Sequence, residues 1–375
     1  MEGNGNIVSK RNCKIEFMRF VFCVMVICFH SCRQLHMNPV EVFGHRLTFF
    51  SYGYVGVGFF FLVSGYLMGK SVYRANERAL AEPGLSVPDL GKETWQFWLH
   101  KYTSIFPYHV VAFILLFVEC MIEQGWRGGE LVTRILDAVP NFFLIQKLGF
   151  NYKSVNGVTW YISAMLIAML LLYPLCRKFY SMFVHVIGPF LGFAIIGYLQ
   201  YTYGTVAGVN TWTGFGFKCV WRAVAEISIG VVCFEVSRIF SQKEWRKDQR
   251  VFATILELLG YAFVFAYAIL GLSKKYEIYC VCILAVCIVL TFSECSYGTR
   301  FFDRKWVYFL GKISLPLYLN QMFAIHIAKA CFAGYRMRIQ LVVLAAALGV
   351  ACAFSALTLK GVRCITLKLE QKKIN

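Results

Sequence analysis

The segment IEFMRFVFCVMVICFHSCRQL (residues 15–35) decides the fold, because it is long and apolar enough to cross a lipid bilayer as one helix. It nevertheless contains Arg19 and His30, with Glu16 near its start. Ionisable side chains inside a membrane span are costly and usually mark a functional site. Eleven helical residues turn the chain by about 1100° and rise about 16 Å. Arg19 and His30 therefore share one face, at a spacing that fits a ligand with a phosphorylated head and a long thin arm.

The whole chain has the composition of an integral membrane protein. Of its 375 residues, 58% are hydrophobic and 15% are charged, which is typical of polytopic membrane proteins and rare in soluble domains of this length. The net charge of +18 is explained by Lys and Arg in loops, so we expect no nucleic-acid partner. Most of the 15 cysteines lie singly in apolar runs, and we interpret them as small buried hydrophobic residues.

Hydrophobic runs predict an all-helical membrane bundle of about ten transmembrane helices that forms a single domain over residues 1–375. A further apolar segment, 139–150, is too short to cross and is predicted to be interfacial or re-entrant. The expected spans are 15–35, 47–69, 103–122, 158–176, 181–201, 217–237, 251–272, 276–293, 307–328 and 339–358.

Lys and Arg are unequally distributed between the loops that these spans leave. With the N-terminus in the cytoplasm, the inside segments carry roughly twice as many basic residues as the outside loops. Short loops rich in Lys and Arg remain in the cytoplasm when a membrane protein inserts. We therefore predict that both termini are cytoplasmic.

Six stretches of sequence are informative because of their order. They are RNCKIEFMRFVFCVMVICFH (11–30), GVGFFFLVSGYL (56–67), FWLHKYTSIFP (97–107), WYISAML (160–166), the pattern of Arg222, Glu226 and Gly230 at intervals of four, and LGKISLPLYLNQ (310–321). Together they resemble the acyltransferase 3 family of integral-membrane acyltransferases over almost the whole chain.

The resemblance implies transfer of an acyl group, usually acetyl, from cytoplasmic acyl-CoA to a hydroxyl of an envelope or exported glycan. The donor would be acetyl-CoA and the acceptor a glycan or lipid-linked sugar, with the lipid bilayer as the surroundings of the protein. The resemblance also implies a standalone O-acetyltransferase without a fused extracytoplasmic domain, located in the bacterial cytoplasmic (inner) membrane.

The catalytic residues that this resemblance implies are His30 and Glu226. Transfer to a hydroxyl needs a base that takes the hydroxyl proton, and a neutral imidazole is suited to this near pH 7. Histidine also forms covalent intermediates, so His30 is predicted to be either a general base or an acyl carrier. Glu226 is one candidate for holding the imidazole tautomer. Arg222 lies four residues before Glu226, so a structural ion pair is the alternative role.

Donor binding is predicted for Arg19, Lys101, Ser64 and Arg11. Arginine grips phosphates with forked hydrogen bonds, and lysine acts as a point charge. Anchoring at the membrane interface is the alternative role for Arg19 and Lys101. Ser64 lies in a span rich in small residues, where it either lines a path for the donor's arm or allows close helix packing. The family usually has two arginines in the segment that here contains Lys101, so the grip on the donor head differs.

Acceptor binding is predicted for Arg222, Asn320, Gln321 and Trp160. Gln321 stands where the family has a late histidine, and an amide forms hydrogen bonds with a sugar or carbonyl but is no base. Trp160 either stacks on a sugar ring or belongs to an interfacial aromatic belt. In the sequence, no group of His, Cys, Asp and Glu has metal-ligand spacing, so no metal is predicted.

Two other functions use the same residues. A transporter or flippase for a sugar or polyprenyl-linked substrate also needs intramembrane Arg, Glu and His side chains. A non-catalytic subunit of an envelope complex would instead depend on surface patches and tolerate the loss of His30. Consumption of the acyl-CoA thioester distinguishes the enzyme from both alternatives.

Overall fold

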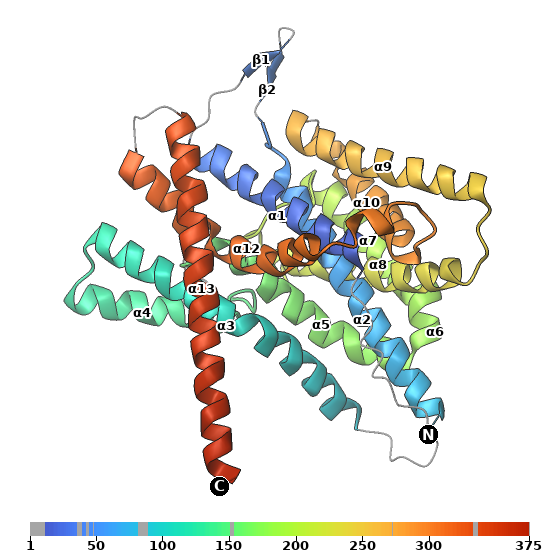
Figure 1. Ribbon diagram of the computed structural model, residues 1–375, viewed down its shortest axis with the longest axis horizontal. Helices are drawn as coiled ribbons and strands as arrows, with labels where there is room; N and C mark the ends of the chain where they lie inside the picture. Colours follow the sequence, from blue (N-terminus) through green and yellow to red (C-terminus); the bar gives the residue numbers. More distant parts are fainter. Residues whose placement is uncertain are drawn as a thin grey trace.

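The computed structural model describes residues 12–35, 40–42, 45–47, 49–81, 89–150, 154–271, 273–332 and 337–374. It is a bundle of long helices (Figure 1). The long helices are α1 (Cys13–Gln34), α2 (Gly56–Ala81), α3 (Leu90–Gln124), α4 (Gly128–Phe142), α5 (Trp160–Lys178), α7 (Gly188–Tyr203), α8 (Lys218–Ser241), α9 (Lys247–Leu270), α10 (Glu277–Ser293), α12 (Lys305–Phe332) and α13 (Met337–Ile374).

Short elements connect these helices. A β-hairpin follows α1, with Val40 opposite Leu47. The short elements are β1 (Val40–Val42), β2 (His45–Leu47), the single turns η1 (Gly53–Val55), η2 (Gly157–Thr159) and η4 (Lys274–Tyr276), the π-helical η3 (Phe183–Ile187), α6 (Tyr180–Met182) and α11 (Thr299–Phe302).

The prediction of an all-helical membrane bundle is confirmed. Within the described ranges, eight helical segments are long and apolar enough to cross a membrane. Helices α8 and α12 occupy the other two predicted spans, 217–237 and 307–328, and they carry buried charged or amide side chains among their apolar ones. The eight segments are Cys13–Gln34, Gly53–Ala81, Leu90–Gln124, Gly157–Lys178, Tyr180–Tyr203, Lys247–Leu270, Lys274–Ser293 and Arg338–Thr358.

Helix ends differ from the predicted span ends, since hydrophobicity marks the bilayer rather than the helix. Helix α2 begins at Gly56 instead of 47 and continues to Ala81, well past the predicted end at 69. Helix α3 begins at Leu90, where the Asp89 carboxylate accepts the Gly91 N–H at 2.8 Å and caps the helix. The extended ends of α2 and α3 carry basic side chains.

The segment 139–150, predicted to be interfacial or re-entrant, is the end of α4 and the turns that follow it. One face of α4 exposes large apolar side chains at helical spacing. This pattern suits a helix that lies along a membrane surface. The exposed residues are Val132, Ile135, Leu136 and Val139.

Helices α1, α2 and α8 lie at the centre of the bundle, between two apolar cores. One core adds side chains of α3, α5, α12 and α13, and the other adds those of α7, α9 and α10. Figure 1 shows these two groups on either side of the central helices. Polar side chains on the central helices are therefore held by packing from both sides.

The backbones of α2 and α8 cross in direct contact because glycines face each other. A Cβ atom on Gly65 would lie 2.1 Å from the carbonyl oxygen of Ile227, and one on Gly230 would lie 2.2 Å from that of Leu62. Small residues allow such close approach between membrane helices. The small residues of the second predicted span thus serve helix packing at this crossing.

Replacing Gly65 with alanine is expected to destabilise the protein, because the added methyl group meets backbone that cannot move aside. Overpacking of this kind costs about 1–3 kcal/mol or more. Thermal denaturation of the detergent-purified protein measures the effect. Gly197→Ala on α7 is the control, since no atom lies within 4 Å of its added Cβ. Equal denaturation temperatures for the two variants would contradict the crossing described here.

Candidate active site

A cavity of about 710 Å³ lies at the predicted cytoplasmic end of α1, where α2 and α3 also end or begin. Five basic side chains line it, whereas its carboxylates are those of Glu16 and Glu294. We call it the basic cavity. Its basic residues are Arg19, Lys70, Arg74, Arg78 and Lys101.

The part of α2 beyond the predicted span supplies three of these cations. Lys70, Arg74 and Arg78 are spaced by four residues and so share one face of the helix. Within the described part of the chain, no ion pair or hydrogen bond is formed by these three side chains. Arg19 lies 3.4 Å from Glu16, and the Lys101 amine stands 5.8 Å from the centre of the Phe97 ring. The basic cavity therefore has a surplus of positive charge.

A second cavity, of about 490 Å³, lies at the other end of α1 and contains His30. We call it the histidine cavity. Arg33, Arg222 and Lys274 bring positive charge to it. Aromatic rings form much of its remaining wall, and they belong to Phe29, Tyr52, Tyr54, Trp160 and Tyr318.

A buried ion pair stands at the inner wall of the histidine cavity. The Arg222 guanidinium donates to Glu226 at 2.8 Å, and the two side chains are 3% and 0% exposed. Gly58 makes room for the pair, because a Cβ there would lie 3.4 Å from Oε2 of Glu226. That Oε2 atom accepts no hydrogen bond from any described residue. Arg222 faces the cavity, and Glu226 fixes its charge in place.

Another buried carboxylate, that of Glu277, forms hydrogen bonds with residues at the rim of the same cavity. Its side chain accepts a hydrogen bond from the Tyr54 hydroxyl. It also accepts the Thr205 hydroxyl at 2.7 Å and the Val206 N–H at 2.8 Å. Residues 206–209 line the histidine cavity. Glu277 thus ties the loop after α7 and the turn before α2 to the start of α10.

Along α1, cavity-lining residues recur every three or four positions, so Arg19 and His30 lie on one stripe of the helix. The two cavities nevertheless share no lining residue among those described. No single cavity among those described therefore runs from Arg19 to His30.

A small polar layer lies at the level between the two cavities. The Ser64 hydroxyl on α2 is 3.4 Å from the Tyr161 hydroxyl and 3.3 Å from the Met165 sulfur, both on α5. Arg19 and Glu226 both interact electrostatically with the Tyr161 hydroxyl. These contacts join α2 to α5 between the residues of the basic cavity and those of the histidine cavity.

The structure distributes the predicted site residues over these features. Arg19 and Lys101 line the basic cavity, Ser64 belongs to the layer, and Glu226 pairs with Arg222. No hydrogen bond joins Glu226 to His30 in the described part of the chain. The residues that line the histidine cavity are His30, Trp160 and Arg222.

Three predicted residues lie elsewhere. Arg11 is outside the described residues. Asn320 is fully buried and donates to the carbonyl oxygen of Pro316 at 2.9 Å. Gln321 is also buried and donates to the carbonyl oxygen of Tyr318 at 2.8 Å. Neither amide lines one of the two cavities, whereas Tyr318 does.

Sequence reasoning missed several residues of these sites. Lys70, Arg74 and Arg78 follow the predicted span 47–69, and their spacing by four is a signal for one helix face. The sequence offered a weaker signal for Glu277, an acidic residue at the start of an apolar span. Tyr161 had no distinguishing signal, since aromatic residues make up 17% of the chain.

One comparison with known proteins bears on this arrangement. A family model for the acyltransferase domain of the acyltransferase 3 family matches residues 14–358, nearly the whole chain. No curated protein and no solved structure matches the chain. The matched region contains Arg19, Lys101 and His30 together with the helices that hold them. The chain therefore belongs to the acyltransferase 3 family and is a multi-pass membrane acyltransferase.

Proposed function

We propose that the protein transfers an acetyl group from cytoplasmic acetyl-CoA to a hydroxyl of an envelope or exported glycan. The observation that carries this proposal is the placement of a basic cavity and a histidine cavity at the two ends of one stripe of α1. A donor that is anionic at one end and reactive at the other matches that placement. The protein then works in the bacterial cytoplasmic membrane, with both termini in the cytoplasm.

The basic cavity suits the phosphorylated head of coenzyme A. Its volume, about 710 Å³, is within the range of small-molecule sites. The arginines supply forked hydrogen bonds to phosphate oxygens, and Lys70 and Lys101 supply point charges. Since these cations outnumber the carboxylates of the cavity, a polyanion is favoured over a neutral or cationic ligand.

In the proposed reaction the acceptor hydroxyl attacks the thioester carbonyl carbon in the histidine cavity. His30 takes the hydroxyl proton as the new C–O bond forms. The C–S bond then breaks, and the proton passes from the imidazolium to the departing thiolate of coenzyme A. Arg222 lies in the same cavity and stabilises the negative charge that develops on the carbonyl oxygen. Trp160 and Tyr52 offer ring faces for the sugar.

The pantetheine arm reaches His30 only when the Ser64–Tyr161–Met165 layer opens. The required movement is small, since rotation of the Tyr161 and Met165 side chains clears the contacts with Ser64. The arm then runs about 16 Å along α1. Closing the layer after transfer prevents water from crossing the membrane through the protein.

Turnover of the thioester tests the proposal. The protein is reconstituted into vesicles with acetyl-CoA outside and a glycan acceptor inside, in the orientation where the basic cavity faces the donor. We expect release of free coenzyme A thiol and acetylated acceptor in equal amounts. No thiol release with any acceptor supplied on the opposite side would reject an acyltransferase of this kind.

The same assay addresses the second candidate, a transporter or flippase. Two cavities that face opposite sides and are separated by a closed layer also suit alternating access. A transporter would move a labelled sugar or polyprenyl-linked substrate across the vesicle membrane without consuming thioester. Measuring substrate movement and thiol release in one preparation therefore distinguishes the two functions.

Neutralising the α2 cations is expected to weaken donor binding specifically. Arg74→Gln and Arg78→Gln should each raise the KM for acetyl-CoA about 10-fold with little change in kcat, because a charged hydrogen bond contributes about 1.5–3 kcal/mol. The effect should shrink at high salt. Lys178→Gln is the control, since this basic residue is also at the predicted cytoplasmic side but lines neither cavity. An unchanged KM in both arginine variants would contradict the proposal that the donor head binds in this cavity.

A further inference from the structure

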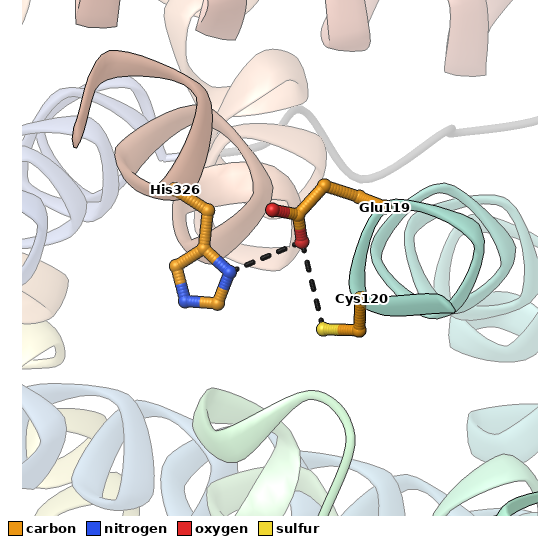
Figure 2. A group of neighbouring side chains, drawn as sticks. All are labelled: Glu119, Cys120 and His326. Carbon is orange, nitrogen blue, oxygen red and sulfur yellow. Dashed lines mark hydrogen bonds and ion pairs between the residues drawn. The ribbon is translucent and has the colours of Figure 1, made fainter. Parts of the chain in front are cut away.

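Three side chains with metal-binding atoms meet away from both cavities. Glu119 and Cys120 lie near the end of α3, and His326 lies near the end of α12 (Figure 2). Nδ1 of His326 is 3.1 Å from Oε2 of Glu119, and the Cys120 sulfur is 3.5 Å from the same oxygen. All three potential ligand atoms lie within 4.8 Å of one another. None of these residues lines the basic or the histidine cavity.

The chemistry of this group matches one class of ion. An imidazole nitrogen, a thiolate and a carboxylate oxygen are the ligand types of zinc sites. Calcium and magnesium prefer oxygen ligands throughout. The cysteine and histidine therefore favour a transition-metal ion such as Zn²⁺.

Two of the three ligand-to-ligand distances are close to those of a formed site, and the third is within 4.8 Å. A tetrahedral zinc ion with ordinary bond lengths places a nitrogen and an oxygen ligand about 3.4 Å apart, and a sulfur and an oxygen ligand about 3.6 Å apart. The corresponding distances here are 3.1 Å and 3.5 Å. Changes of a few tenths of an ångström bring these two pairs to the separations that zinc requires.

Without a metal ion, hydrogen bonds hold the same atoms together. The Glu119 carboxylate accepts one hydrogen bond from the His326 ring and one from the Cys120 thiol. Binding of Zn²⁺ displaces the Nδ1 proton to the other ring nitrogen and releases the thiol proton. The thiolate and the carboxylate then neutralise the ion. A neutral complex is favourable for helix ends that border a membrane, since a net charge there would be costly.

The surroundings provide access and a fourth ligand. The His326 side chain is 28% exposed, so neighbouring protein does not enclose the ring. Cys120 also lines a cavity of about 220 Å³ that contains polar side chains, including Gln124 and Asp137. Glu123 interacts electrostatically with Cys120 from one turn further along α3. A water molecule as the fourth ligand completes a tetrahedral shell and keeps the complex neutral.

We propose that Glu119, Cys120 and His326 form a zinc site that clamps α3 to α12. The ligands come from positions 207 residues apart in the chain, so the ion joins two helices that no local motif connects. Helix α12 carries Tyr318 of the histidine cavity, and α3 carries Lys101 of the basic cavity. The site lies outside the acyl-transfer chemistry and acts on the packing of the helices that carry it.

Cobalt substitution tests the clamp in the full-length protein, purified in detergent after removal of any affinity tag. Co²⁺ occupies zinc sites and reports a thiolate ligand through a charge-transfer absorption. We expect about one equivalent bound, with this absorption present and displaced by Zn²⁺. Cys120→Ser is expected to abolish the absorption, and Glu119→Gln, which keeps the side-chain shape, is expected to lose most of the binding. Cys28→Ser is the matched control, a half-buried cysteine elsewhere, and should change nothing.

Stability provides an independent readout. Zinc at a hundred-fold excess over its Kd is expected to raise the denaturation temperature of the wild-type protein by about 3 °C. The shift should vanish in His326→Ala and persist in Cys28→Ser. The proposal is overturned if the wild-type protein gives no thiolate–cobalt absorption, or if that absorption depends on Cys28 and survives in Cys120→Ser. Thioester turnover plays no part in either measurement, so failure here leaves the proposed function unaffected.

Discussion

Replacing His30 with alanine is expected to abolish acyl transfer while the protein remains folded and inserted. The imidazole lines the histidine cavity, which lies at the opposite end of α1 from the basic cavity. Removing a general base slows a reaction about 10²- to 10⁴-fold, and removing a covalent acyl carrier stops it. Release of coenzyme A thiol in vesicles measures the loss.

The control for this variant is His185→Ala, which removes an exposed histidine of the π-helical turn η3. It should turn over thioester at the wild-type rate. Both variants should elute as single species in detergent, which excludes misfolding as the cause. Product formation by His30→Ala at the wild-type rate would contradict a catalytic role for this residue. Another residue would then have to act as the base.

Replacing Glu226 with alanine is expected to lower the free energy of unfolding by about 3–5 kcal/mol, because it leaves the buried Arg222 guanidinium without its partner. The matched control is Glu130→Ala on α4. Glu130 also pairs with an arginine four residues away, at 3.3 Å, but the two side chains are 54% and 34% exposed. An exposed pair of this kind contributes less than about 1 kcal/mol.

A double variant distinguishes the cost of leaving one buried charge unpaired from the cost of lost side-chain packing. Replacing Arg222 with Met and Glu226 with Leu removes both charges and keeps the apolar volume, so stability should return to within about 1 kcal/mol of the wild type. Thermal denaturation and thioester turnover are measured on the same samples. Recovered stability without turnover would assign Arg222 to the reaction, whereas recovered turnover would restrict the pair to a structural role.

The sequence predicted the kind of fold well, because long apolar runs have few alternatives in a membrane. Arg19 and His30 share a stripe of α1 for the same reason, since the period of a helix is fixed. The ends of α2 and α3 were not predicted, because nothing in a hydropathy pattern marks where a helix continues into water. The cations Arg74 and Arg78 therefore lie beyond the end of the predicted span at 69, on a helix that continues to Ala81.

Contacts between distant segments were beyond sequence reasoning. Ser64 and Tyr161 meet across 97 residues, and His326 and Glu119 across 207. Local spacing carries no information about such pairs. For that reason the sequence suggested one continuous path where the structure has two separate cavities, and it did not indicate the proposed zinc ligands that α3 and α12 bring together.

The glycine crossing of α2 and α8 limits how this protein can work. Since the two backbones touch at Gly65 and Gly230, these helices cannot move closer together at their crossing. They carry Arg74 of the basic cavity and Arg222 of the histidine cavity, so this crossing joins the walls of the two cavities through direct backbone contact. A path between the two cavities is therefore expected to open by rotation of side chains such as Tyr161 and Met165 on α5, rather than by a closer approach of α2 and α8.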